Sequence, residues 1–242
     1  MSNKREDFLN GILKIEQPDE SMGLRVNLDT VLLSYFSEPR KNERILELGC
    51  AHGAISLILA YRGFNVVGLD IQRLLIEMAK RNALYNGLEA KTEFIAGDLR
   101  EYKKLWPAQS FDRIVVNPPY DVPENSRVSP SSPVAVALQG TECALEDIVL
   151  ASKYLLKNKG HLEMVIRANR IGELLALLDE HNISPKEMRP VYSKPNMDAF
   201  IVLVRAMRAA GPSVRVLPPF FVKDENGDDT LELLSAYKAG KY

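Results

Sequence analysis

Cysteine and histidine are scarce in this chain, and their scarcity excludes several kinds of protein. Two cysteines, Cys50 and Cys143, are too few for a disulfide framework or a structural zinc site. The three histidines are scattered along the chain and show no spacing typical of metal ligands. We therefore expect a protein without a metal.

Long apolar runs are missing as well. No stretch is long and uncharged enough for a membrane span, and the charged start of the chain lacks the apolar core of an export signal. Hydrophobic residues make up 46% and charged residues 26% of the 242 positions, as is typical of a globular protein with a sizeable core. The sequence thus predicts a cytoplasmic protein without membrane contact.

Net charge is close to zero, at −1, but it is unevenly distributed. Residues 153–223 hold 12 Lys and Arg against 6 Asp and Glu, whereas residues 224–242 hold 2 against 5. A polyanionic partner is expected to meet the basic stretch. The alternative is that these charges are spread over several solvated faces, and charge alone does not decide between the two.

Strand-like and helix-like segments alternate from residue 44 onward. Such alternation predicts an α/β protein with a mostly parallel sheet and helices on both faces. We expect a central domain over residues 44–210, with residues 1–43 and 211–242 packed on it as appendages. The expected strands are 44–48, 65–70, 92–95, 112–116, 160–166, 188–192 and 199–206, and the expected helices are 27–36, 53–61, 71–86, 142–157 and 169–181.

The most informative segment is Asn117-Pro118-Pro119-Tyr120, directly after an apolar strand. Two prolines cannot continue a sheet, so the chain must turn out at the carboxyl edge, where open parallel sheets bind ligands. The Asn117 side chain and the Pro118 carbonyl offer two acceptors for a flat exocyclic amine, and Tyr120 offers a ring for stacking. The alternative is that this segment is a rigid turn at the end of the strand with a purely structural role. The long segment 118–141 that follows is predicted to form a wall or lid of the substrate site.

A second group of residues predicts a nucleoside site. The first strand of the domain leads into Glu47-Leu-Gly-Cys-Ala-His-Gly53, in which Gly49 and Gly53 permit a sharp turn and close approach of a ligand. Asp70 ends the next strand, where a carboxylate can accept hydrogen bonds from ribose hydroxyls. It can also cap the following helix. Asp98, after the third strand, is placed to contact an adenine edge.

This set fits either a dinucleotide or a nucleoside cofactor such as S-adenosyl-L-methionine. The glycine spacing and the missing hydride-transfer residues argue against a nicotinamide dinucleotide. The double-proline turn favours S-adenosyl-L-methionine, because the methyl group would lie near the bound amine. Cys50 is expected to pack in the turn rather than act as a nucleophile, and His52 to be structural.

In this order and spacing, the segments 47–53, 70, 98 and 117–120 resemble the class I methyltransferases that methylate exocyclic amines. The segments 17–33 and 215–227 are further similar to the bacterial tRNA1(Val) adenine-N6 methyltransferases. The resemblance implies a Rossmann-like fold with a seven-stranded sheet, and an N-terminal segment that covers the cofactor. It implies catalytic roles for Asn117, Pro118 and Tyr120. The residues that it implies at the cofactor are Glu47, Gly49, Cys50, Ala51, Gly53, Asp70, Ile71, Asp98, Leu99 and Asn117.

Ala51 departs from the family pattern, because it stands where the central glycine of the cofactor loop is usual. We expect alanine to be accommodated there by a negative φ.

The expected activity is S-adenosyl-L-methionine-dependent methylation of the N6 amine of an adenosine in tRNA, in the anticodon loop of a valine tRNA by resemblance. Alternatives are a protein methyltransferase acting on a glutamine amide, a guanine-N2 methyltransferase acting on ribosomal RNA, and a non-catalytic RNA-binding scaffold. A DNA methyltransferase is disfavoured because the chain has no room for a target-recognition domain. The sequence predicts no oligomeric state.

Overall fold

A computed structural model of the chain describes residues 5–18, 25–118 and 144–238. Pro119, Tyr120, the remainder of the predicted substrate wall and Cys143 lie outside these residues. The elements are β1 (Arg5–Phe8), β2 (Leu13–Glu16), α1 (Leu28–Phe36), β3 (Arg44–Leu48), α2 (Ala54–Tyr61), β4 (Asn65–Asp70), α3 (Arg73–Tyr85), β5 (Thr92–Ala96), η2 (Leu99–Glu101), α4 (Tyr102–Leu105), β6 (Phe111–Val116), α6 (Leu145–Leu155), β7 (Leu156–Arg167), η3 (Ala168–Arg170), α7 (Ile171–Glu180), β8 (Ile183–Tyr192), β9 (Ala199–Arg208), β10 (Arg215–Val216), β11 (Phe220–Phe221) and α8 (Leu231–Ala236).

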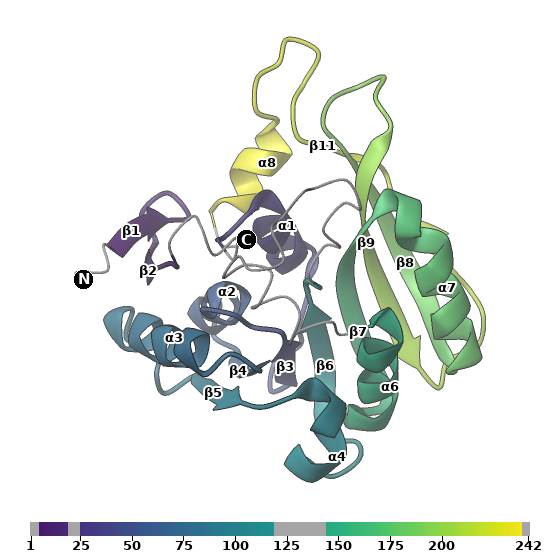
Figure 1. Cartoon of the computed structure of the whole chain (residues 1–242). Helices are drawn as coiled ribbons and strands as arrows, with labels where there is room; N and C mark the ends of the chain where they lie inside the picture. The colour runs from purple at the N-terminus through teal and green to yellow at the C-terminus, as the bar shows by residue number, and fades with distance from the viewer. Residues whose placement is uncertain (1–4, 19–24, 119–143, 239–242) are drawn as a thin grey trace, which may run out of the picture.

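The centre of the fold is one sheet with the order β10-β8-β9-β7-β6-β3-β4-β5, and β11 pairs with β8 (Figure 1). Strands β3 to β8 run parallel, whereas β9 lies antiparallel between β7 and β8. The predicted α/β class and mostly parallel sheet are confirmed. The seven predicted strands correspond to β3–β9, to which β10 and β11 each add two residues at the β8 edge.

Helices cover both faces of the sheet, as alternation predicted. Helices α1, α2 and α3 pack on one face, and α4, α6 and α7 pack on the other (Figure 1). Successive residues of each strand enter opposite cores: Val115 of β6 belongs to the first and Val116 to the second. Such strands are buried on both sides, which explains why they are mostly apolar rather than alternating between apolar and polar residues.

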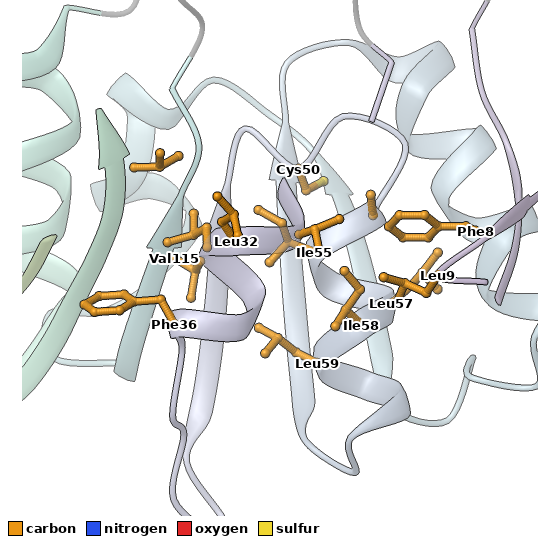
Figure 2. Packing of buried hydrophobic residues seen from close by; sticks show 14 of the residues in the cluster. Phe8, Leu9, Leu32, Phe36, Cys50, Ile55, Leu57, Ile58, Leu59 and Val115 are labelled. Atoms are coloured by element: carbon orange, nitrogen blue, oxygen red, sulfur yellow. The ribbon is translucent and has the colours of Figure 1, made fainter. Parts of the chain in front are cut away.

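The first core joins segments that are far apart in the sequence. Figure 2 shows Leu32 and Phe36 of α1 beside Val115, and Phe8 and Leu9 of the N-terminal hairpin on the opposite side of α2. The C-terminal segment contributes Phe220 and Leu233 to the same cluster of buried residues. Residues from all three expected parts of the chain therefore share one core.

The hairpin β1–β2 was not predicted. Its two strands are four residues each and pair antiparallel, with Arg5 opposite Glu16 and Phe8 opposite Leu13. The helix expected at 27–36 is present as α1, and Asn27 is its N-cap, accepting a hydrogen bond from Thr30 N at 3.1 Å.

Several predicted boundaries were wrong. Helix α6 ends at Leu155 rather than at 157, and β7 begins immediately at Leu156. Strand β8 begins at Ile183 rather than at 188, although it contains Pro185 and Pro190. These prolines obscured the strand in the sequence. They are tolerated because only the short strands β10 and β11 pair along the outer side of β8.

Charged side chains cross the sheet on the α1 face. Glu163 of β7, Arg205 of β9 and Glu187 of β8 stand opposite one another in the strand register. They form ion pairs, with the Arg205 Nε to Glu163 Oε1 distance at 2.7 Å. Arg113 of β6 joins Glu163 at one end of this row, and Arg215 of β10 joins Glu187 at the other. We call these five residues the charge ladder.

The charge ladder also holds the chain that follows α1. Arg205 donates to the Phe36 carbonyl at 2.7 Å, and Arg113 donates to the Glu38 carbonyl at 3.1 Å. Arg113 and Glu163 are 2% and 0% exposed, so this end of the charge ladder is a buried ionic network.

Much of the basic excess in residues 153–223 is offset by carboxylates of the protein itself. Besides the charge ladder, Arg189 pairs with Glu232 at 2.8 Å and Lys223 pairs with Asp229 at 2.6 Å. Acidic residues of the C-terminal segment thus neutralise basic residues of the sheet. These ion pairs reduce the basic charge that is left for a polyanionic partner.

Residues 5–18, 25–118 and 144–238 contain no helix that is both long and apolar enough to cross a membrane. They also contain no group of three or more His, Cys, Asp or Glu side chains arranged to hold a metal ion.

Candidate functional site

Three neighbouring strands end together and their loops are tied to one another. Gly49 N and Cys50 N, after β3, donate to the Leu69 carbonyl at the end of β4 at 2.8 and 3.0 Å. Gly97 N, after β5, donates to the Asp70 carbonyl at 2.9 Å. The structure thus brings the predicted segments 47–53, 70–71 and 98–99 to one edge, and β6 places Asn117 on the other side of β3.

The two glycines of the loop after β3 serve different purposes. Gly49 has φ +69° and is exposed. Apart from its two chain neighbours, no atom of the described residues lies within 4 Å of the position that a Cβ would take, which leaves room for a ligand. Gly53, with φ +88°, begins α2, and a Cβ there would come within 3.0–3.1 Å of Phe94 and Ala79. The first glycine therefore suits ligand approach, and the second allows the helix to pack closely on β5 and α3.

Ala51 adopts a left-handed conformation with φ +47°, so the expected negative φ is wrong. The Ala51 amide donates to Asp70 Oδ2 at 2.8 Å, and this bond holds the residue in a conformation that costs an L-residue about 1–2 kcal/mol. The loop has kept the shape that a central glycine would give it, and alanine is strained within it.

We expect Ala51→Gly to raise the free energy of unfolding by about 0.5–1 kcal/mol, because relief of strain exceeds the added flexibility of the unfolded chain. Urea unfolding measures this change. Ala60→Gly, the same replacement inside α2, should instead lower the free energy of unfolding by about 1 kcal/mol. Destabilisation by both replacements would contradict the strain at Ala51.

Asp70 is 8% exposed and has acceptor capacity to spare. Its Oδ2 accepts from Ala51 N and its Oδ1 from Gln72 N, each at 2.8 Å, which leaves one lone pair on each oxygen. Burial raises the pKa of Asp70 despite these two bonds. The alternative role of Asp70 as a cap of the following helix is confirmed in part, because the Gln72 amide that donates to Asp70 lies at the start of α3. The adjacent Ile71 is 41% exposed and offers an apolar surface beside the carboxylate.

Glu47 faces α2. Its Oε2 accepts from Ser56 N at 2.8 Å and from the Ser56 hydroxyl, and the side chain is 3% exposed. Burial raises the pKa of Glu47 from 4.5 to about 8. In this structure the carboxylate fastens the start of α2 to the end of β3.

The raised pKa of Glu47 predicts a pH-dependent stability. The folded protein holds this proton more tightly than the unfolded chain, so the resulting stability is fully present below pH 4.5 and is lost as pH rises through 8. Relative to Glu47→Gln, which cannot titrate, the free energy of unfolding of the wild type should fall by a few kcal/mol (on the order of 3–5) between pH 5 and 8. Urea unfolding of both proteins across that range measures it. A difference that does not vary with pH would contradict the prediction.

Cys50 and His52 are both buried. The Cys50 side chain is 2% exposed and packs in the first core, near Ile55 in Figure 2, and burial raises the pKa of its thiol. A packing role rather than a nucleophilic one follows. Burial lowers the pKa of His52 to about 4, so its ring is neutral at pH 7, and neither ring nitrogen has a hydrogen-bond partner among the described residues.

Asp98 and Leu99 lie after β5. The Asp98 carboxylate accepts from Arg100 N at 2.9 Å and from the Arg100 side chain, which lowers the pKa of Asp98. Asp98 is also the N-cap of η2, which begins at Leu99. An adenine amine at this position would have to share the carboxylate with Arg100.

Asn117 directly follows β6, and its amide is oriented by α1. Nδ2 donates to Thr30 Oγ1 at 3.4 Å, and Thr30 Oγ1 in turn donates to Asn27 Oδ1 at 3.2 Å. The Asn117 Oδ1 is buried and has no hydrogen-bond partner among the described residues. A buried acceptor without a partner is costly, and a ligand donor is a sufficient explanation for it. Pro118 is half-buried beside it.

These observations fit S-adenosyl-L-methionine. The open backbone at Gly49, the spare acceptors of Asp70 and the apolar surface of Ile71 suit, respectively, the amino-acid, ribose and adenine parts of the cofactor. The Oδ1 of Asn117, which has no partner within the described part of the chain, suits an amine next to it. When bound, the cofactor would supply an electrophilic methyl group.

Sequence analysis missed two residues at this site. Thr30, in the first turn of α1, orients Asn117, and Asn82 of α3 reaches the cofactor loop, donating to the His52 carbonyl at 3.0 Å. The signal for Asn82 was present, because Asn82 and Asn86 are polar residues one turn apart on the face of α3 that is otherwise apolar.

Known proteins resemble this chain over most of its length. The chain is 23% identical over 184 residues to a tRNA1(Val) (adenine(37)-N6)-methyltransferase of Aliivibrio salmonicida, covering 75% of this chain and 76% of that protein. It is 28% identical to the protein of the same name from Shewanella loihica, covering 74% of each. The expected resemblance is thus confirmed.

A solved structure shows the same fold. A predicted O-methyltransferase from Agrobacterium tumefaciens superimposes with a TM-score of 0.72 at 18% identity, covering 88% of this chain and 98% of the other. Residues 39–185 match the family described as "Methyltransferase domain". The enzyme class and the expected cofactor, S-adenosyl-L-methionine, are confirmed by this match together with the relatives. The chain therefore belongs to the family of proteins that share this methyltransferase domain.

Proposed function

We propose that this enzyme methylates the exocyclic N6 amine of an adenosine in tRNA. The observation that carries the proposal is the buried Oδ1 of Asn117, which has no hydrogen-bond partner among the described residues. Thr30 holds this side chain at the carboxyl edge of β6. This oxygen can accept a hydrogen bond from a substrate N–H group, and it lies beside a loop suited to S-adenosyl-L-methionine. The tRNA1(Val) (adenine(37)-N6)-methyltransferases that resemble this chain support adenosine 37 of a valine tRNA as the target.

The roles of the described residues follow from their atoms. Asn117 Oδ1 and the Pro118 carbonyl would accept the two N–H groups of the amine and orient its nitrogen toward the methyl group. Positioning of this kind can supply about 7–11 kcal/mol of the barrier reduction. The described site residues include no strong base, and none is required, because the amine proton becomes acidic once the methyl group has been transferred. Stacking on Tyr120 stays a prediction from the sequence.

The carboxyl edge beyond Asn117 supports an RNA substrate. Arg167 at the end of β7 and Lys194 after β8 are exposed there. Tyr192 and Phe221, at the ends of β8 and β11, lie with ring centroids 5.4 Å apart. Basic and aromatic side chains together suit single-stranded RNA, where phosphates and unstacked bases are both within reach.

The experiment is methyl incorporation from labelled S-adenosyl-L-methionine into unmodified tRNA, with mass spectrometry of the product nucleosides. N6-methyladenosine in tRNA is the expected result. Parallel reactions with ribosomal RNA and with a glutamine-containing release factor distinguish the alternatives. N2-methylguanosine, or methylglutamine without tRNA methylation, would overturn the proposal while retaining a methyltransferase of an amine or amide.

A further inference from the structure

Helix α3 holds the N-terminal hairpin through two asparagine side chains. Asn82 Oδ1 accepts from Glu16 N at 2.7 Å, and Asn82 Nδ2 donates to the Glu16 carbonyl at 3.0 Å. One turn later, Asn86 Oδ1 accepts from Lys14 N at 2.9 Å, and Asn86 Nδ2 donates to the Lys14 carbonyl at 2.7 Å. The two amides pair with alternate residues on the outer edge of β2, as a neighbouring strand would.

Asn82 makes one further bond that Asn86 does not make. Its Nδ2 also donates to the His52 carbonyl, at 3.0 Å, between Ala51 and Gly53 of the cofactor loop. Asn82 is 0% exposed, and its acceptor and both donor hydrogens are used. One buried amide therefore joins the hairpin to the cofactor loop.

The cofactor loop needs support because both residues that flank His52 have positive φ, +47° at Ala51 and +88° at Gly53. Asp70 holds it on the β4 side through the Ala51 amide. Asn82 holds it on the α3 side through the His52 carbonyl. Without Asn82 the His52 carbonyl would lose this hydrogen bond, and of these two side-chain bonds to the loop only that of Asp70 would remain.

We propose that Asn82 is a positioning residue that fixes the cofactor loop and couples docking of the N-terminal hairpin to binding of S-adenosyl-L-methionine. The proposal rests on the assignment of loop 49–53 to the cofactor but does not depend on the RNA substrate. Binding of the cofactor stabilises the loop, and through Asn82 it stabilises the hairpin; a docked hairpin strengthens cofactor binding by the same factor.

The test compares Asn82→Ala with Asn86→Ala in binding of S-adenosyl-L-homocysteine by isothermal titration calorimetry. Each variant loses two bonds to β2 and one further bond. The further bond is the one to the cofactor loop in Asn82→Ala, and in Asn86→Ala it is the 2.7 Å bond from Asn86 Nδ2 to the Asn82 carbonyl within α3. We expect Asn82→Ala to raise the Kd at least tenfold with the stoichiometry still near one, and Asn86→Ala to raise it less than threefold. Equal changes in both variants, or no change in Asn82→Ala, would overturn the proposal.

Steady-state kinetics provide a readout that mere loss of folded protein would not produce. Asn82→Ala should raise the KM for S-adenosyl-L-methionine about tenfold and leave kcat within threefold at saturation, whereas partial unfolding would lower kcat alone. A fall in kcat at constant KM contradicts a positioning role.

Hydrogen exchange of the wild type keeps the proposal testable if Asn82→Ala does not fold. Saturating S-adenosyl-L-homocysteine should slow exchange of the amides of residues 13–16 at least fivefold, although these residues lie outside the cofactor loop. Unchanged exchange in the hairpin would overturn the coupling. If the wild type does not bind S-adenosyl-L-homocysteine at all, the cofactor assignment itself is wrong. A wild type that binds it but does not methylate tRNA would overturn only the proposed substrate.

Discussion

Replacing Asn117 by alanine should lower kcat for methyl transfer by about 100- to 1,000-fold, the usual effect of removing one preorganised hydrogen-bonding group from an active site. The variant loses the buried Oδ1 that lacks a partner among the described residues, and with it the acceptor proposed for the amine. Methyl incorporation into tRNA under single-turnover conditions measures the effect. Binding of S-adenosyl-L-homocysteine should stay within about threefold of the wild type, because the spare acceptors of Asp70 are untouched.

Thr30→Val is the matched control for orientation of the Asn117 amide. Valine has nearly the shape of threonine but cannot accept the 3.4 Å hydrogen bond from Asn117 Nδ2. The amide would then be free to rotate, and kcat should fall about tenfold, much less than in Asn117→Ala. Full activity of Asn117→Ala would rule out the proposed binding of the amine by Asn117, whatever the effect of Thr30→Val.

Glu163→Ala is expected to lower the free energy of unfolding by about 3–5 kcal/mol, because it leaves two arginines without their shared partner in the interior. Glu163 is 0% exposed, and it binds Arg113, Arg205 and the Ser37 hydroxyl. Arg113 itself is 2% exposed, so water cannot replace the lost carboxylate without rearrangement. Urea unfolding followed by circular dichroism measures the loss.

Glu187→Ala is the matched control within the same charge ladder. Glu187 is 14% exposed, and its partner Arg215 is 71% exposed, so solvent can take the place of the carboxylate there. We expect a loss of about 1 kcal/mol, close to that of a surface ion pair. Comparable losses in the two variants would show that depth in the sheet does not determine the contribution of each pair.

Sequence periodicity was sufficient to predict the strands of the sheet, because these strands are buried on both faces. A segment such as 114–116 is apolar at every position, and a strand-like run between helical patterns has few alternatives in an α/β protein. The hairpin β1–β2 was not predicted, because its own sequence holds little of the information that determines it. Its strands are four residues long, and the outer edge of β2 is satisfied by side chains of α3, a contact that local sequence does not encode.

Several residues of the candidate site were predictable from the sequence, whereas the contacts that orient them were not. Strand ends and special residues indicated Asp70, Asn117 and the loop at Gly49, and the structure brings these to one edge. The orientation of Glu47 toward Ser56 and the left-handed conformation of Ala51 depend on neighbours supplied by α2 and β4. Local propensity favours negative φ for alanine, and here a tertiary hydrogen bond overrides it.

The charge ladder bears on how the chain reaches its native state. Arg205 bonds to the Phe36 carbonyl across 169 residues of sequence, and Glu163 and Arg113 are joined across 50. On a ribosome, Glu163 is made before the arginine that completes its environment, so the interior charges stay hydrated until β9 emerges. Because such distant contacts must form together, closure of the central sheet is a late and comparatively slow event, and chains that end before β9 cannot complete it.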